Sequence, residues 1–304
     1  MRDLDRRGAF LAAACLVAGL AAACGSSGSG KINAVGAENE YANVISQIGG
    51  PYVNVTAVMS NPNTDPHTFE ASPQVAQTVA AAQLVIQNGV GYDSFMDTIE
   101  SAQPDSGRQV IDVQTLLGLP DSTANPHLWY DPTTMPAVAT AIAHDLSALD
   151  PSHASYFEAQ VTSFDDSLAP WTAAISALKA SYAGAPVAVT EPVPDYMLQA
   201  AGLDDVTPWP FQADIMNGVD PSAQDVSLEQ GFLTQHTVKV FLYNQQVTDS
   251  LTQSLLSLAQ QNGIPVVGVY ETMPTPGYTY QTWMEAEVNA VQQALSTGVS
   301  TTKL

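Results

Sequence analysis

The chain has 304 residues, and its 30 aspartates and glutamates stand against 8 lysines and arginines, a formal net charge of −22 at pH 7. Such a chain lacks the basic patch that phosphate contacts require, so nucleic acid is excluded as a partner. A negative field attracts cations and keeps a protein soluble, although adaptation to a salty or charged environment would give the same balance. The length suits two domains.

The first thirty residues have the pattern of a secretory leader followed by a lipid attachment site. Basic residues at positions 2, 6 and 7 precede an apolar stretch, residues 9–23, which is shorter than the ~20 residues that a membrane-spanning helix needs. Small residues then lead to Cys24, and a Gly/Ser-rich tether follows it. This segment resembles a bacterial lipoprotein cleavage site. We therefore expect a signal peptide over 1–23, then a lipidated Cys24 and a flexible tether over 24–30.

The leader also predicts where the protein resides. It implies an extracytoplasmic protein attached to the cell membrane through a lipid. The arginine pair at positions 6 and 7 leaves the export route open between the general secretory and the twin-arginine pathway. The only other cysteine, Cys15, lies in the leader. We therefore expect a folded body without a disulfide or a cysteine-ligated metal.

Short apolar runs with strand character alternate with helical patterns along the rest of the chain, which indicates an α/β fold. The expected strands are residues 32–35, 53–58, 84–87 and 110–113 in the first half, and 186–190, 238–243 and 265–270 in the second, with helices between them such as 73–82 and 248–261. These two groups predict an N-terminal α/β lobe over 31–149 and a C-terminal α/β lobe over 185–304.

Residues 150–184, between the two groups of strands, have the pattern of one long helix. Asp150-Pro151 is a typical helix start, and large apolar residues then recur at steps of four and three from Phe157 to Tyr182, which forms a single stripe. A helix of this length spans roughly 48 Å, so we expect a rigid linker that braces both lobes. Pro170 conflicts with this expectation, because an interior proline kinks a helix and removes a hydrogen bond.

Four short segments each place one potential metal ligand at a strand end or in a turn-rich loop. Two of them are Pro-His pairs, which contain His67 and His127, and the other two are Glu191 and Glu271, each directly after an expected strand. Ligands in open α/β sheets bind beyond the carboxyl ends of the strands. We therefore expect the two histidines of one lobe to face the two glutamates of the other. Two imidazoles and two carboxylates suit zinc or manganese.

Each of these residues alone is weak evidence, because an isolated Pro-His pair in a loop is most often solvated and a carboxylate after a strand most often caps a helix. The four segments in order are more specific. His144, His153 and His236 lie in or beside helical patterns or before a strand, and we interpret them as structural or exposed.

Together the segments resemble the zinc and manganese solute-binding proteins of ABC importers, many of which are lipoproteins. The resemblance covers essentially the whole mature chain, and it rests on Ile-Gly-Gly at 48–50, Asp-Pro-His-Thr-Phe-Glu at 65–70, Pro-His-Leu-Trp-Tyr-Asp-Pro at 126–132, Leu-Asp-Pro at 149–151, Glu191 and Pro-Ser at 221–222. It implies two Rossmann-like lobes joined by a long rigid helix, with the metal in the cleft between them. It also implies a monomer that carries one Zn²⁺ or Mn²⁺ to the membrane permease of an ABC importer.

The resemblance places the two histidine ligands of the family on His67 and His127. The third ligand, His or Glu among members, falls on Glu191, and the fourth, usually Asp, falls on Glu271, which is longer by one methylene. Many zinc members have a His- and acid-rich loop that is missing here, where only residues 119–124 precede the second motif. That absence and Glu191 resemble the manganese members, whereas a site contracted around the longer Glu271 suits zinc. The metal therefore stays open between the two.

Two other functions remain as alternatives. A zinc-dependent enzyme usually keeps one open coordination position beside three protein ligands, and the sequence has no HExxH motif and no nucleophile elbow. We therefore do not expect an enzyme. An envelope adhesin or scaffold that metal merely stabilises would unfold on metal depletion, whereas a carrier must survive without its cargo.

Overall fold

The computed structural model describes residues 30–63, 66–274 and 276–304 of the protein. The expected signal peptide, Cys24 and the tether up to residue 29 lie outside the described residues. The chain divides into two units, Met1–Gly30 and Lys31–Leu304, and the elements below all belong to the second. None of the described helices is long and apolar enough to cross a membrane.

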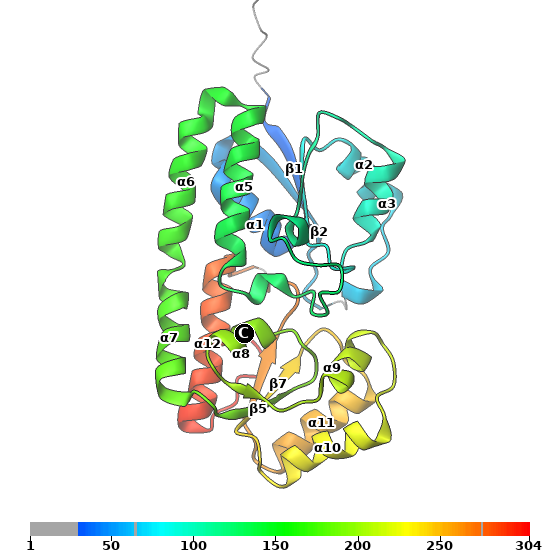
Figure 1. Ribbon diagram of the computed structural model, residues 1–304, viewed down its shortest axis with the longest axis vertical. Coiled ribbons are helices and arrows are strands. Elements are labelled where there is room, and N and C mark those ends of the chain that lie inside the picture. Colours follow the sequence, from blue (N-terminus) through cyan, green and yellow to red (C-terminus); the bar gives the residue numbers. More distant parts are fainter. Residues whose placement is uncertain (1–29, 64–65, 275) are drawn as a thin grey trace, which may run out of the picture. The chain divides into compact units, whose positions relative to one another are not determined.

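Two four-stranded sheets, one in each lobe, organise the second unit (Figure 1). The first contains β1 (Ile32–Glu38), β2 (Val53–Met59), β3 (Leu84–Gln87) and β4 (Gln109–Asp112) in the order β2-β1-β3-β4, and the second contains β5 (Pro186–Val189), β6 (Asp204–Asp205), β7 (Val240–Asn244) and β8 (Val266–Val269) in the order β6-β5-β7-β8. All neighbouring strands are parallel. The predicted α/β fold with two Rossmann-like lobes is confirmed.

Helices cover both faces of the first sheet. They are α1 (Asn39–Gly49), α2 (Pro73–Ala80), α3 (Phe95–Ala102), α4 (Val113–Leu116) and α5 (Thr134–Leu149), with 3₁₀ turns η1 (Gly50–Tyr52), η2 (Pro66–Thr68) and η3 (Leu128–Tyr130). Along β3, Leu84 and Ile86 join the core that contains α1 and α5, while Val85 joins the core that contains α2 and α3. A strand buried on both faces needs an unbroken apolar run, which explains the visible strand signal at 84–87.

The second sheet is covered in the same way by α8 (Asp195–Ala200), α9 (Trp209–Met216), α10 (Ala223–Thr234), α11 (Ser250–Gln261) and α12 (Tyr280–Thr297). Along β7, Val240 and Leu242 pack into the core that includes α12, and Phe241 and Tyr243 pack against α9, α10 and α11. The two-residue strand β6 was not predicted, because two aspartates carry no apolar pattern.

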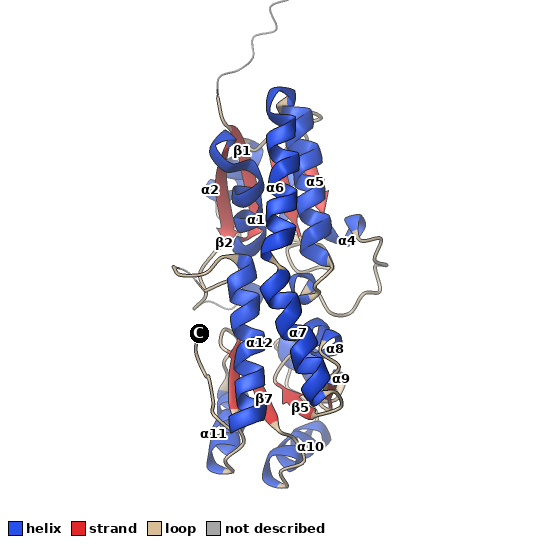
Figure 2. Ribbon diagram, turned by 90° about the vertical axis from the view of Figure 1, so that its left-hand side faces the viewer, coloured by secondary structure: helices blue, strands red, loops and turns tan. Residues whose placement is uncertain are grey.

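The linker differs from the predicted single helix. The turn η4 (Pro151–His153) is followed by two helices, α6 (Ala154–Ser167) and α7 (Ala169–Tyr182). Leu168 separates them. The Leu168 N–H donates to Asp165 O, a 3₁₀-type bond, and Pro170 lies in the first turn of α7, where a proline loses no hydrogen bond. The expectation of one uninterrupted helix is therefore wrong at this point. Helix α6 packs against α1 and α5, and α7 packs against α8 and α12 (Figure 2).

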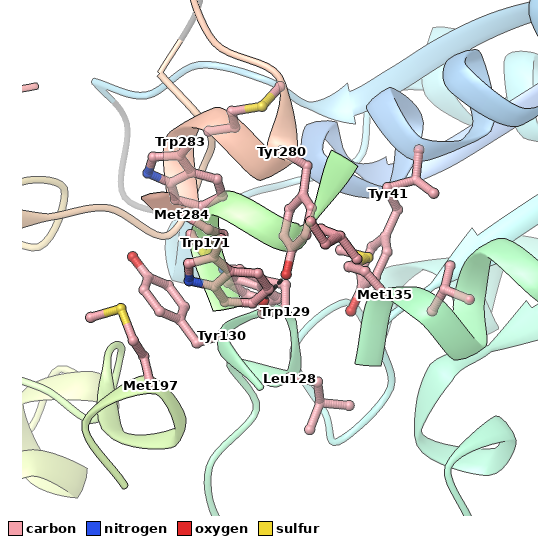
Figure 3. Close-up of a cluster of buried hydrophobic side chains, with 14 of the residues drawn as sticks. Tyr41, Leu128, Trp129, Tyr130, Met135, Trp171, Met197, Tyr280, Trp283 and Met284 are labelled. Carbon is pink, nitrogen blue, oxygen red and sulfur yellow. Dashed lines mark hydrogen bonds between the residues drawn. The ribbon is translucent and has the colours of Figure 1, made fainter. Parts of the chain in front are cut away.

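A cluster of buried aromatic side chains joins the two lobes (Figure 3). Trp129 and Tyr130 of η3, Trp171 of α7, and Tyr280 and Trp283 of α12 belong to one continuous core. The Tyr280 hydroxyl donates to Trp129 O at 2.6 Å. Lobes that share a large apolar interface do not move freely against each other, so the segments that meet beside this cluster are held in fixed positions.

Candidate metal centre

Three of the four predicted residues meet at one point. His67 lies in η2 after β2, His127 directly precedes η3, and Glu271 lies two residues after β8. One potential ligand atom from each lies within 4.8 Å of the others. Glu271 Oε2 is 3.1 Å from His67 Nε2 and 3.3 Å from His127 Nε2. His67 and His127 belong to the first lobe and Glu271 to the second, so the three residues come together only in the folded chain.

The fourth predicted residue, Glu191, lies outside this group of three but is connected to it. Asn244, the last residue of β7, donates from Nδ2 to Glu191 Oε1 at 3.1 Å and to Glu271 Oε1 at 2.6 Å. Glu191 and Glu271 are 1 % and 0 % exposed. The two carboxylates are thus neighbours held by a common amide, and Glu271 contacts both histidines directly.

The Asn125 side chain determines the tautomer of His127. Asn125 Nδ2 donates to Pro192 O at 2.7 Å, and Asn125 Oδ1 accepts from the His127 backbone N–H at 3.0 Å. The same oxygen lies 2.8 Å from His127 Nδ1. Because that oxygen can only accept, Nδ1 carries the proton. In the neutral imidazole the Nε2 lone pair then faces Glu271 Oε2, and two acceptors in contact require a proton or a cation between them.

Electrostatics favour the protonation states that a metal needs. Burial, opposed by the hydrogen bond to Glu271, lowers the pKa of His127 below its ordinary value. Burial also acts to raise the pKa of Glu271, but His67 and His127, when their imidazoles are protonated, outweigh it through their charges and hydrogen bonds and hold that pKa well below its usual range. A neutral imidazole and an ionised carboxylate are the forms that bind metal ions.

Tyr92 is a site residue that the sequence analysis missed. Its hydroxyl donates to Glu271 Oε2 at 2.9 Å, and its ring lies edge-on to the His67 and His127 rings with centroids 5.5 and 5.9 Å away. The preceding Gly89-Val90-Gly91 has positive φ at all three residues, an unusual conformation for the β-branched Val90. The signal that was available is the Gly-Val-Gly-Tyr run that begins two residues after an expected strand.

The backbone around Glu271 is anchored from both lobes. Gln246 Oε1 accepts from the N–H groups of Glu271 and Thr272, at 2.7 Å each. In the first lobe, the Asn39 side chain donates to Met273 O at 2.9 Å and accepts from Met273 N at 3.0 Å. The central carboxylate therefore sits on a segment with little freedom to move.

The group is open to solvent on the side of His67. The His67 side chain is 22 % exposed, whereas those of His127 and Glu271 are 0 % exposed. A cavity of about 370 Å³ is bordered by His67 and Tyr92 of the first lobe and by Trp209 and Met216 of α9. An ion from solvent would meet His67 first and the buried pair last.

The other three histidines lie elsewhere, as predicted. The His144 side chain is 82 % exposed and pairs with Asp145 on α5. His153 pairs with Asp150 beside η4, and His236 is exposed with a positive φ.

Comparisons with known proteins place these features in a family. The family model described as zinc-uptake complex component A, periplasmic, matches residues 35–294. The manganese-binding lipoprotein MntA of Bacillus subtilis is 25 % identical over 156 residues, which is 48 % of this chain and 51 % of MntA. The chain therefore spans about half the length of this curated relative.

Solved structures share the fold. The periplasmic zinc-binding protein TroA of Treponema pallidum superposes with a TM-score of 0.74 at 18 % identity, over 89 % of this chain and 100 % of TroA. FpvC of Pseudomonas aeruginosa, solved in complex with Mn²⁺, superposes with a TM-score of 0.72 at 19 % identity, over 87 % of this chain and 98 % of FpvC. At these identities the likeness concerns the fold alone. Because the family model covers most of the sequence, the chain belongs to the family of zinc-uptake complex component A periplasmic proteins.

Proposed function

We propose that this protein is an extracytoplasmic solute-binding lipoprotein. It captures one divalent transition metal ion, zinc or manganese, and delivers it to the membrane permease of an ABC importer. Binding and transfer, without catalysis, are its role. The names of its relatives support this proposal, since MntA is a manganese-binding lipoprotein and TroA a periplasmic zinc-binding protein.

The observation that carries the proposal is the contact between His127 and Glu271. The Asn125 amide leaves the His127 Nε2 lone pair directed at Glu271 Oε2, 3.3 Å away, while His67 Nε2 approaches the same oxygen at 3.1 Å. Two nitrogen donors and a carboxylate oxygen converge there. Such a donor set suits zinc and manganese, and a second carboxylate would neutralise the divalent charge.

The proposed ligands are His67, His127, Glu271 and Glu191. Glu191 would complete the set by a small movement toward the other three, because its Oε1 is already held by Asn244 beside Glu271. With four protein ligands, no coordination position remains for an activated water, in keeping with a carrier. By the Irving–Williams order, zinc should bind more tightly than manganese in vitro.

Titration of the metal-free full chain, purified in detergent, with zinc tests the site. We expect one zinc per chain, and a loss of at least tenfold in affinity, about 1.4 kcal/mol, for each of His67→Ala, His127→Ala and Glu271→Ala. His144→Ala removes an exposed imidazole and should bind zinc as the wild type does. Unchanged affinity in the His67→Ala/His127→Ala double variant would place the site elsewhere.

The proposed anchor is a lipid on Cys24, and the proposed partner is a permease. Cys24→Ser should abolish metabolic labelling with a fatty acid and release the protein from the membrane fraction. Wild-type protein that carries no lipid would contradict the anchor. Cells that lack the protein should grow poorly in chelated medium and recover with added zinc or manganese. Recovery with neither metal would contradict the importer role.

A further inference from the structure

Asn244 occupies a central position among the proposed ligands. It ends β7, which lies between β5 and β8 in the second sheet. Glu191 follows β5 and Glu271 follows β8, so the side chain of Asn244 lies between the two carboxylates. It is 0 % exposed. No part of it is available to solvent, and its polar atoms all act within the protein.

The orientation of the Asn244 amide follows from its partners. Its Oδ1 accepts from the Gln246 backbone N–H at 2.9 Å, and its own backbone N–H donates to Thr190 Oγ1 at 3.0 Å. A rotated amide would direct oxygen at two carboxylates and leave the Gln246 N–H without its acceptor. Nδ2 therefore faces the carboxylates, and its two hydrogens serve one each: Glu191 Oε1 at 3.1 Å and Glu271 Oε1 at 2.6 Å.

Because of the bond from Asn244, the two oxygens of Glu271 have different partners. Oε1 accepts the short bond from Asn244, while Oε2 faces His67 and His127. A carboxylate that binds a metal through both oxygens must turn both toward the ion. For Glu271 that would pull Oε1 out of its 2.6 Å bond to a buried amide, and a buried donor left unpaired is destabilising. Glu191 is restricted in the same way, because its Oε1 accepts from Asn244 at 3.1 Å.

We propose that Asn244 is a specificity-determining residue that holds Glu191 and Glu271 to one metal-binding oxygen each and so favours zinc over manganese. The proposal rests on the metal-binding function proposed above and deepens it. Two imidazole nitrogens and two single carboxylate oxygens make the four-coordinate site that zinc prefers. Manganese takes sites richer in oxygen and of higher coordination number, which two bidentate carboxylates would supply.

Competitive titration with zinc and manganese, on the metal-free full chain in detergent, tests the proposal. Loss of a side chain that positions ligands typically costs 10- to 100-fold in metal affinity. We expect Asn244→Ala to lose about that much for zinc, and at least about tenfold less for manganese, because the released carboxylates can then bind through both oxygens. The ratio of the two affinities should shift at least about tenfold toward manganese.

A matched control separates specificity from general support. Asn125→Ala removes another buried amide of the same centre, one that acts on His127, and it should weaken both metals alike. An equal loss for the two metals in Asn244→Ala would mean that Asn244 only supports the fold, which overturns the proposal. Wild-type protein that binds neither metal would instead overturn the proposed function.

A second measurement needs no variant and so does not depend on how Asn244→Ala folds. Crystal structures of the wild-type protein loaded with zinc, and separately with manganese, show whether each carboxylate binds through one oxygen or two. We expect monodentate carboxylates with both metals, and a four-coordinate zinc. Bidentate binding by Glu191 or Glu271 in the wild type would contradict the proposal.

Discussion

Asn125 shows how a single side chain can orient a proposed ligand and connect two lobes at once. Its Oδ1 faces His127, its Nδ2 donates to Pro192 O in the second lobe, and its backbone carbonyl accepts from the Tyr196 hydroxyl at 2.9 Å. The segment that carries His127 is therefore tied to the segment that follows Glu191. A hydrogen bond from the outer imidazole nitrogen orients a metal-binding histidine and fixes its tautomer.

Two substitutions at this position should separate the tautomer effect from the connection between lobes. Asn125→Ala removes the acceptor for His127 Nδ1–H and should weaken zinc binding by about 10- to 100-fold. Asn125→Asp keeps an acceptor but loses the donor to Pro192 O, so it should retain most of the wild-type affinity. Isothermal titration checks both. If the two variants lose affinity equally, the contact with His127 Nδ1 is not the cause.

The loop that follows β3 is the element whose conformation most directly serves the site. It turns through three residues with positive φ before Tyr92 reaches Glu271. Asp93 stabilises this turn, because its carboxylate accepts from the backbone N–H groups of Asn88 at 2.6 Å and Gly89 at 3.0 Å. Strained backbone at a binding site persists only where the surrounding contacts hold it.

Gly89→Ala and Gly91→Ala form a matched pair that tests this loop. Their φ values are +77° and +75°, so both alanines pay a similar cost of roughly 1–2 kcal/mol for a left-handed backbone. A Cβ at Gly89 would lie 2.8 Å from Gln114 Cβ, whereas a Cβ at Gly91 would meet nothing within 4 Å. We expect Gly89→Ala to be less stable than Gly91→Ala by a further ~1–3 kcal/mol. Urea unfolding measures the difference, and equal midpoints would contradict the predicted clash.

The break between α6 and α7 gives the linker its own test. Inside a continuous helix Pro170 would cost ~3 kcal/mol, and Pro170→Ala would recover that stability. In the first turn of α7 the proline does not reduce stability, and replacing it only increases the conformational freedom of the unfolded chain. Pro170→Ala should then leave the free energy of unfolding unchanged or lower it by ~0.4–1 kcal/mol. A large gain in the urea midpoint would show that the proline strains the linker.

Across the whole molecule, the formal charge of −22 counts carboxyl groups that the fold buries. Burial raises the pKa of Glu229 and Glu287 to about 8 each. It also raises the pKa of Glu38 and Glu40 well above the ordinary value. The protein near neutral pH is therefore less negative than its composition implies, and part of its stability depends on pH.

Glu287 offers the clearest case, because its hydrogen bonds also indicate a neutral acid. Tyr130 Oη lies 2.7 Å from both Tyr270 O and Glu287 Oε2. The hydroxyl has one proton, which the carbonyl must receive. A protonated Glu287 can donate to Tyr130 Oη while its Oε1 accepts from Trp283 Nε1 at 2.7 Å. The amide of a glutamine would reproduce both contacts.

The sign of the pH effect follows from this shift. The pKa of Glu287 in the folded state, about 8, exceeds that of the unfolded chain, so the folded state binds more protons between the two values and stability falls as pH rises through that window. Glu287→Gln should therefore match the wild type near pH 4.5 and be more stable at pH 8.5. Urea unfolding of metal-free protein at several pH values checks this, with the partly exposed Glu285→Gln on the same helix as control. Parallel profiles for Glu287→Gln and wild type would contradict it.

The sequence by itself determined the class of fold and indicated the four residues of the proposed donor set. Buried parallel strands need continuous apolar runs, so seven of the eight strands in the described residues were visible, and the two Pro-His segments indicated His67 and His127 as candidate ligands. Glu271 follows from its place directly after an expected strand. A pattern of residues along the chain is enough for such inferences, because each depends on neighbours a few positions away.

Only the tertiary structure decided how these residues meet. Both histidines contact the Oε2 atom of Glu271, and the Asn244 amide, which also donates to Glu271, connects Glu191 to this group. Tyr92 and Asn244 had no predicted role, since their partners lie on other strands and loops: Tyr92 contacts a residue 179 positions along the chain. The break at Leu168 was missed for a similar reason: the apolar stripe continues through it, and only the structure shows that a new helix, α7, begins at Ala169. Hydrogen-bond geometry between distant segments selects the tautomer of an imidazole and the free oxygen of a carboxylate, and no local pattern encodes distances of that kind.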